Sequence, residues 1–181
     1  MHSSEEEISQ WKLFRQGDWN AYTYFFNRYF SVLYNYGHKF TRNSILVEDG
    51  IQDLFVGLWT NRQTLTDPES IKNYLYKALR HNLFRKIQSQ ARFLALPEDK
   101  SMFADIPFDQ QWVLLEEEET TKQRVSVCIA TLPPRQREII FLRFYESFDY
   151  TEIANVMDIT VASAYKLLYK ALHGMQLCLR A

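Results

Sequence analysis

The sequence is poor in the residues that break or cross-link a chain. Its 181 residues include only five glycines, five prolines and two cysteines. Few breakers, together with apolar residues that repeat at intervals of three and four, predict an all-helical protein. Cys128 and Cys178 lie far apart in the sequence and have no metal-ligand spacing. We therefore expect two buried, reduced cysteines, and neither a disulfide nor a structural zinc site.

Long apolar runs are also missing. No stretch approaches the about 18 apolar residues that a membrane-spanning helix needs, so we expect no direct insertion into a membrane. The opening segment MHSSEEEIS is acidic, whereas a secretory signal has a basic start followed by an apolar stretch. These features predict a cytoplasmic protein.

Motifs for catalysis are absent from the sequence. It has no HExxH motif, no glycine-rich phosphate loop and no serine elbow, and its four histidines are scattered. Glu48, Asp49 and Asp53 share one face of a predicted helix, which is one feature of a metal site. Without a partner histidine, however, that face is better interpreted as solvated or as a docking face. We expect no enzyme activity, no cofactor and no bound metal.

The charges are unevenly distributed, although the formal net charge is only −1. Residues 70–97 hold six basic side chains and no acidic one, and residues 159–181 hold three basic and none acidic. Between them, residues 98–119 hold one basic and eight acidic side chains. Clustered cations favour binding to a polyanion such as nucleic acid, and a solvated helix face is the alternative.

Apolar periodicity divides the chain into two helical bundles. Four helices are expected up to about residue 93, and one of them is so rich in aromatic residues that it must be central to a core. Over residues 94–119 the periodicity fades, two prolines appear and acidity peaks, which is typical of a linker. Helices resume afterwards. The predicted domains are therefore 1–93 and 120–181, joined by an acidic linker over 94–119.

The segment YTEIANVMDITVASAYKLLY has the pattern of a helix-turn-helix. Ala154 is small where the two helices cross, Asp158 lies in the turn, and Thr160 can cap the second helix. The predicted inward apolar residues are Ile153, Met157, Ile159, Val161, Ala164, Leu167 and Leu168. The predicted outward residues are Ala162, Ser163, Tyr165, Lys166, Tyr169, Lys170 and His173. This outward face contains no carboxylate and suits phosphates and the major groove, whereas a helical hairpin with a solvated face is the alternative.

Four motifs in order along the chain resemble those of a bacterial sigma factor of the extracytoplasmic-function group. RQGDWNAYTYFFNRYF is similar to the opening pattern of the family, and VEDGIQDLFVGLW is similar to its helix that docks on the RNA polymerase clamp. YLYKALRHNLFRKI resembles the promoter-melting segment, and LPPRQREIIFLRFYESFDYTEIANVM resembles the start of the C-terminal domain. The resemblance implies a protein that binds core RNA polymerase and directs promoter-specific transcription initiation.

The resemblance also implies roles for residues in the first bundle, which would bind polymerase and read the promoter −10 element as a single strand. The implied polymerase-binding residues are Glu48, Asp49, Gln52, Asp53, Phe55 and Trp59. The implied −10 residues are Lys72, Tyr74, Lys77, Arg80, His81, Asn82, Arg85 and Lys86. We favour Asn82 over His81 as the contact to a flipped base, because an amide pairs with base edges in either direction. Tyr74 and Trp59 have a competing interpretation as core residues.

The second bundle would read the −35 element as duplex DNA. The implied residues are Thr160, Ala162, Ser163, Tyr165, Lys166, Tyr169 and Lys170. The chain departs from the family in having no arginine between residues 144 and 179, which puts its base preference in doubt. The tyrosines of this helix suggest apolar contact with thymine methyl groups instead.

The partners implied by the resemblance are core RNA polymerase, promoter DNA and an anti-sigma factor, which in this family is often membrane-tethered. A free-standing helix-turn-helix regulator is the competing hypothesis. It would explain the second bundle but would leave the motifs of the first bundle without a role.

Overall fold

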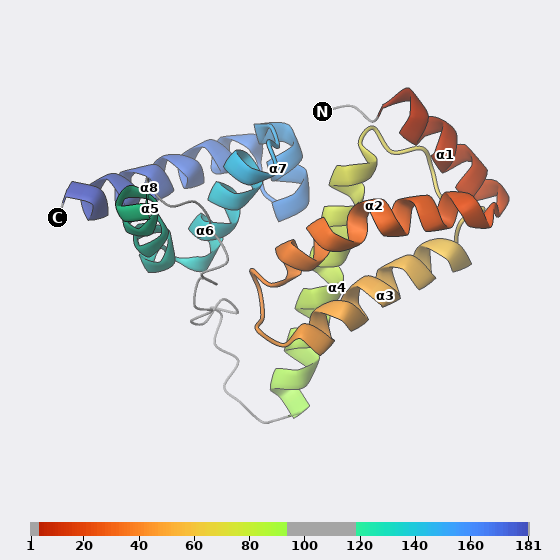
Figure 1. The fold of residues 1–181 in the computed structure, drawn as a ribbon, viewed down its shortest axis with the longest axis horizontal. Coiled ribbons are helices and arrows are strands. Elements are labelled where there is room, and N and C mark those ends of the chain that lie inside the picture. Colours follow the sequence, from red (N-terminus) through yellow and green to blue (C-terminus); the bar gives the residue numbers. More distant parts are fainter. Residues whose placement is uncertain (1–3, 94–118, 181) are drawn as a thin grey trace. The chain divides into compact units, whose positions relative to one another are not determined.

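The computed structural model of the chain describes residues 4–93 and 119–180. Every regular element within these ranges is a helix (Figure 1). The elements are α1 (Glu5–Gln16), α2 (Trp19–Gly37), α3 (Ser44–Thr60), α4 (Ile71–Phe93), α5 (Glu119–Thr131), α6 (Pro134–Ile140), the π-helical turn η1 (Phe141–Tyr145), α7 (Tyr150–Met157) and α8 (Val161–Arg180). The predicted all-α class is confirmed.

The chain divides into two compact units, Met1–Met102 and Phe103–Ala181. The first unit contains α1 to α4 and the second contains α5 to α8. The predicted acidic linker, apart from Glu119 at the start of α5, lies outside the described residues. No described helix is long and apolar enough to cross a membrane.

Local sequence signals set the helix boundaries of the first unit. Ser4 and Glu7 form a reciprocal capping box at the start of α1, and Gly17 ends this helix with a φ of 93°, a left-handed conformation that glycine adopts without strain. The Asp18 side chain then caps α2, and the Asn43 side chain caps α3. Each cap satisfies a backbone N–H that a helix start leaves unpaired.

The core of the first unit lies among three long helices. Helices α2 and α3 lie side by side, and α4 packs against both (Figure 1). Apolar residues at helical spacing are buried there, with Ile51, Leu54 and Leu58 from α3 and Leu75, Leu79 and Leu83 from α4. Gly50 permits the close approach of α3 to α4, because a Cβ atom at this position would lie 2.7 Å from Cδ2 of Leu83.

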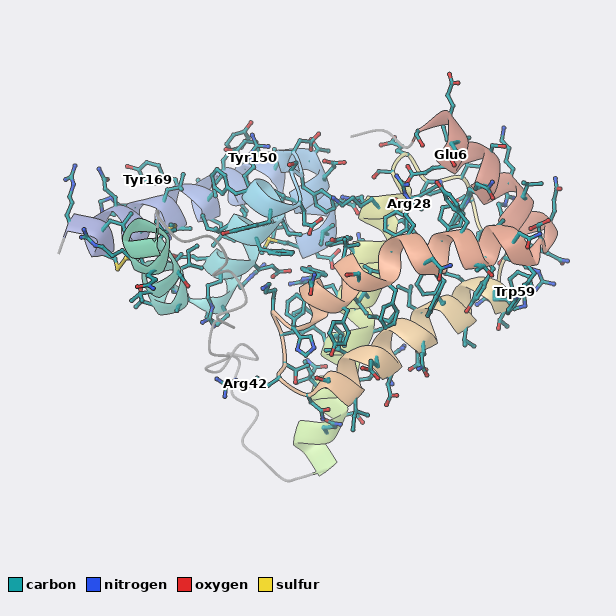
Figure 2. The ribbon with its side chains drawn as sticks, in the orientation of Figure 1. Glu6, Arg28, Arg42, Trp59, Tyr150 and Tyr169 are labelled. Carbon is teal, nitrogen blue, oxygen red and sulfur yellow. A yellow bond between two sulfur atoms is a disulfide. The ribbon has the colours of Figure 1, made fainter. Side chains whose placement is uncertain are left out.

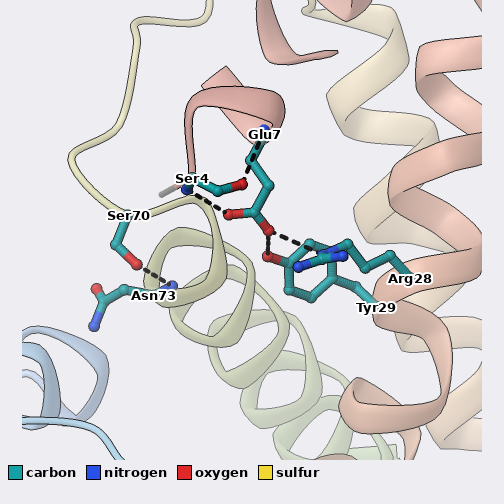
Figure 3. A network of polar contacts seen from close by, with 6 residues as sticks. All are labelled: Ser4, Glu7, Arg28, Tyr29, Ser70 and Asn73. Carbon is teal, nitrogen blue, oxygen red and sulfur yellow. Dashed lines mark hydrogen bonds and ion pairs between the residues drawn. The ribbon is translucent and has the colours of Figure 1, made fainter. Parts of the chain in front are cut away.

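A buried carboxylate joins α1 to α2. Glu7 Oε1 accepts hydrogen bonds from the Tyr29 hydroxyl and from Arg28 Nε, the latter at 3.0 Å (Figure 3). Glu7 Oε2 accepts a third hydrogen bond, from the backbone N–H of Ser4, at 3.1 Å. Burial raises the pKa of Tyr29, and the hydrogen bond to Glu7 raises it further. The phenol therefore remains a hydrogen-bond donor at neutral pH.

The second unit is built around its last helix. Helices α5, α6 and α7 each pack against α8 (Figure 1). Pro134 begins α6, a position at which proline costs no hydrogen bond, and a capping box of Asp149 and Glu152 begins α7. The pattern of PPRQREIIFLRFY favours one α-helix, but the α-helical part ends at Ile140 and continues as the π-helical turn η1 to Tyr145. This departure carries no residue pattern that helical periodicity detects.

The two cysteines are joined in a disulfide between α5 and α8. The Cα atoms of Cys128 and Cys178 are 5.6 Å apart, although 50 positions separate them in the sequence. The prediction of two reduced cysteines is therefore wrong. The two cysteines are brought together because α5 packs against the end of α8, and their spacing in the sequence does not reveal this packing. The expected burial is met by Cys128, which is 3% exposed, but only partly by Cys178.

Candidate nucleic-acid interface

Helix α3 presents a polar, mostly acidic face to solvent. Glu48, Asp49, Gln52 and Asp53 are all exposed, because the helical repeat places them opposite the buried stripe. Four of the six predicted polymerase-binding residues thus share one accessible surface, which we call the acidic face. Within the described residues, no group of histidine, cysteine and carboxylate side chains is arranged to hold a metal ion.

The other two predicted polymerase-binding residues lie elsewhere. Phe55 is 1% exposed and meets the ring of Phe26 edge to face, with centroids 5.1 Å apart, so the prediction that Phe55 contacts polymerase is corrected to a core role. Trp59, near the end of α3 (Figure 2), is half-buried. The exposed Trp19 packs on it edge to face at 5.3 Å, and the guanidinium of Arg62 lies 4.6 Å from the centre of its ring. Trp59 is therefore partly packed and partly accessible, so it fits both the core and the surface interpretation.

The cations of α4 are not equally accessible. His81 and Arg85 are exposed, and Lys72, Lys77 and Lys86 are half-buried. Arg80 is 8% exposed, with its guanidinium 4.4 Å from the centre of the Phe84 ring. The prediction that Arg80 contacts a phosphate of the −10 strand is therefore corrected, since Arg80 is buried and its charged group lies against an aromatic ring within the unit.

A cavity of about 460 Å³ lies between α3 and α4. Its apolar wall includes Leu54, Leu58, Leu65 and Ala78, and its polar residues are Asp53, Asn61, Tyr74, Asn82 and Arg85. The sequence left a choice between Asn82 and His81 as the contact to a flipped base. Asn82 lines this cavity, whereas His81 does not. The cavity brings together residues predicted for strand reading with Asp53 of the acidic face.

The polar groups of the cavity are oriented by their neighbours. Arg85 Nη2 donates a hydrogen bond to Asn82 Oδ1 at 3.1 Å, so the amide nitrogen of Asn82 is the part left for another partner. Burial raises the pKa of Tyr74, and this ring also packs edge to face on Trp11 at 6.0 Å. Tyr74 is therefore both a packed residue and a lining residue, and its hydroxyl stays protonated at neutral pH.

The second unit contains the predicted helix-turn-helix, formed by α7 and α8. Asp158 has φ 51° and ψ 53°, the left-handed conformation that the turn requires and that aspartate tolerates. Thr160 Oγ1 accepts a hydrogen bond from the backbone N–H of Ser163 at 3.1 Å, which confirms it as the cap of α8. Ala154 and Ala164 are both buried, as helices that cross closely require. Val161 is 39% exposed, so the prediction that it faces inward is wrong.

The outward face of α8 is accessible along its first three turns. All seven predicted −35 residues are exposed, namely Thr160, Ala162, Ser163, Tyr165, Lys166, Tyr169 and Lys170. His173 continues the same exposed side one turn further. Because residues 159–181 contain no carboxylate, this surface carries only positive formal charge. We call these seven residues the recognition face.

Two parts of the chain match known families. Residues 25–93 match Sigma-70 region 2, and residues 122–173 match Sigma-70, region 4. The first match includes the acidic face and the cavity, and the second includes the helix-turn-helix. The chain belongs to the sigma-70 family, in its extracytoplasmic-function group. It is thus a sigma factor, a protein of transcription initiation whose partners are RNA polymerase and promoter DNA.

Solved structures share the fold of this sigma factor. CnrH, in complex with the cytosolic domain of CnrY, is 16% identical with a TM-score of 0.66, over 97% of this chain and 98% of that chain. The sigma factor RpoE in complex with the anti-sigma factor NepR, from Bartonella quintana, is 16% identical with a TM-score of 0.60, over 86% of this chain and 94% of that chain. No curated protein matches the sequence significantly.

Sequence reasoning missed an aromatic and cationic stack beside the recognition face of the sigma factor. The ring of Tyr150, at the start of α7, stacks on Tyr165 with centroids 3.6 Å apart. The guanidinium of Arg143 lies 5.2 Å from the centre of the Tyr150 ring. Arg143 stands one position before the arginine-free range that the sequence defines. The stack thus connects an arginine to the recognition face from a neighbouring element.

Proposed function

We propose that this sigma factor divides promoter recognition between its two units. Residues 1–93 bind core RNA polymerase and read and melt the −10 element, and residues 120–181 read the −35 element as duplex. The observation that carries this proposal is the cavity between α3 and α4, because it places Asn82 and Tyr74 beside the acidic face. Reading a separated strand requires a pocket for an unstacked base, with polar groups for its edge.

The acidic face and Trp59 serve polymerase docking in this proposal. Four exposed polar residues on one helix offer carboxylates and an amide to a basic partner surface, while Phe55 supports them from the core. The half-buried and exposed cations of α4, Lys72, Lys77, Arg85 and Lys86, supply phosphate contacts to the strand. Such contacts release condensed counterions and strengthen binding without specifying sequence.

The recognition face of α8 enters the major groove in this proposal. Helix N-termini and lysines favour phosphates, and Tyr165 and Tyr169 offer apolar edges to thymine methyl groups. Arg143, held on Tyr150, supplies a cation at the border of the face.

The deciding experiment is reconstitution with core polymerase. Transcription from the promoters of this protein should require both components, and the protein alone should protect duplex DNA poorly. A clear footprint without polymerase would instead support the free-standing regulator. In the same assay, Asp49→Ala combined with Gln52→Ala should abolish binding to core polymerase while far-ultraviolet circular dichroism stays unchanged.

Two control variants separate docking from folding. Glu6→Ala removes an exposed carboxylate from α1 and should leave polymerase binding intact. Phe55→Ala removes a buried ring and should cost about 3–5 kcal/mol of stability, so its loss of binding should accompany loss of structure. If the Asp49 and Gln52 variant also lost helicity, the docking role of the acidic face would be rejected.

We further propose that an anti-sigma factor holds this protein inactive in the cytoplasm, where its polymerase works, and that it has no catalytic activity of its own. The support is the fold shared with CnrH, solved with the cytosolic domain of CnrY, and with RpoE, solved with the anti-sigma factor NepR. An extract of uninduced host cells should inhibit reconstituted transcription until excess sigma factor is added. Full transcription in the presence of extract would contradict this proposal.

A further inference from the structure

A disulfide and a hydrogen bond both hold α5 to the end of α8. Cys128 is bonded to Cys178, and close by Arg124 Nη2 donates a hydrogen bond to the backbone carbonyl of Leu179 at 2.8 Å. The hydrogen bond is exposed and therefore exchanges with water at little cost. The covalent bond is the stronger of the two constraints on this pair of helices.

The position of Cys128 within α5 makes this constraint important. None of the side chains at 123–127 is buried, and Val127 is 62% exposed. Burial begins at Cys128 and continues with Ile129 and Leu132. Residues 123–127 therefore bury little apolar surface, and the disulfide lies where the burial of the described α5 side chains begins.

The two sulfurs differ in their access to solvent. Cys128 is 3% exposed, whereas Cys178 lies half-buried in the last turns of α8. An external thiolate would therefore attack Sγ of Cys178. In a compartment that contains RNA polymerase, glutathione keeps thiols reduced, and disulfides that do form there are usually transient. This step rests on the cytoplasmic location proposed above.

We propose that the Cys128–Cys178 bond is a reversible thiol–disulfide modification site that controls the attachment of α5 to α8. In reduction, a glutathione thiolate attacks Cys178, forms a mixed disulfide and releases Cys128 as a thiolate that takes up a proton. A second glutathione thiolate then attacks the glutathione sulfur of the mixed disulfide and releases Cys178, so two glutathione molecules leave as glutathione disulfide. Glutathione disulfide drives the reverse reaction, in which the two cysteines lose two electrons and two protons.

The structural consequence of reduction is local. The recognition face is anchored by Ala164 and Leu168, which are buried, whereas Cys178 lies two turns beyond Lys170. Reduction should loosen α5 and the end of α8 and leave the helix-turn-helix folded. The site thus acts on the first and last helices of the second unit, α5 and α8.

The test uses the purified full chain, without polymerase or DNA. The protein is equilibrated with mixtures of reduced and oxidised glutathione, quenched with an alkylating agent and weighed by mass spectrometry. We expect both cysteines to be alkylated in millimolar reduced glutathione and neither to be alkylated in excess glutathione disulfide. A bond that survives millimolar glutathione, or cysteines that stay reduced in glutathione disulfide, would overturn the proposal.

Hydrogen exchange reports the attachment of α5 on the same samples. Amides of residues 124–131 should exchange at least about tenfold faster in the reduced protein, whereas those of α7 should change little. The second unit should also melt about 10–20 °C lower when reduced. The Cys128→Ala and Cys178→Ala double variant should match the reduced protein in both redox buffers. Equal exchange in α5 of the oxidised and reduced protein would reject the control of this helix by the bond.

Because this test counts thiols and exchanged amides, it does not depend on promoter recognition. Failure of the proposed function would leave these results unchanged, and failure of the redox site would leave transcription assays unchanged.

Discussion

Lys86 of α4 and Asp53 of α3 form an ion pair, with Nζ 2.7 Å from Oδ2. The two residues have different proposed ligands, since Asp53 belongs to the acidic face and Lys86 to the cations proposed to contact the strand. Asp53 also lines the cavity. One carboxylate therefore lies where the surfaces proposed for polymerase docking and for strand binding meet.

Replacing Asp53 and replacing Lys86 should change the affinity for the −10 strand in opposite directions. Asp53→Asn removes a negative charge from the cavity and leaves the Lys86 charge uncompensated, so the affinity of saturated holoenzyme for the single-stranded −10 element should rise. Lys86→Gln should lower it. Stability should change by less than about 1 kcal/mol in both, because the Asp53 side chain is 57% exposed. Strand affinities that move in the same direction would contradict this relationship.

Asn82 should contribute more to strand affinity than its neighbour His81. Asn82→Ala removes an amide from the cavity and should weaken binding of the −10 strand by roughly 10–100-fold, a loss of about 1–3 kcal/mol. His81→Ala is the matched control, because His81 does not line the cavity. The measurement is fluorescence anisotropy of a labelled strand with reconstituted holoenzyme. A larger loss for His81→Ala would move the base contact out of the cavity.

Lys166 should bind a phosphate rather than a base. Lys166→Ala should reduce the slope of log affinity against log salt concentration by about 1, with a similar loss on different duplex sequences. Its side chain is exposed on the recognition face, so the fold should be unaffected. Duplex binding by holoenzyme over a series of salt concentrations provides the slope. An unchanged slope would remove Lys166 from the set of phosphate contacts.

The first unit should lose stability in alkaline solution, in part through Tyr29. Burial and the hydrogen bond to Glu7 raise the pKa of this phenol above its ordinary value of about 10. The unfolded chain therefore releases the proton first, so the contribution of Tyr29 is complete below about pH 10 and falls as the pH rises further. Urea unfolding between about pH 9 and 11 measures the effect.

Tyr29→Phe isolates that contribution. The variant should cost about 1 kcal/mol at neutral pH, through the lost hydrogen bond, and should weaken the alkaline loss of stability. Part of the loss should remain, because burial also raises the pKa values of Tyr22, Tyr24 and Tyr74. An unchanged alkaline slope would show that Tyr29 does not take part.

The helices and the recognition face could be predicted because their signals are local. Three helix starts are marked by Ser4, Asp18 and Thr160, whose side chains accept hydrogen bonds from nearby backbone N–H groups. The outward positions of α8 follow from the helical repeat alone. Asp158 is of the same kind, since its turn needs a residue that tolerates left-handed geometry.

The features that could not be predicted depend on contacts between distant segments. Phe55 fits a family motif, but its burial depends on α2, whose Phe26 ring packs against it. Neither the disulfide nor the stack of Arg143 on Tyr150 leaves a periodic pattern in the sequence. Each forms only after packing has fixed the distance between two elements.

Gly50 has a consequence for how this sigma factor can diverge. It allows α3 to approach α4 closely, and the same helix supplies core side chains, the acidic face and a wall of the cavity. Three separate requirements thus act on successive positions of a single helix. Sequence change in α3 is therefore left mainly to exposed positions near its ends, such as Ile45 and Thr60.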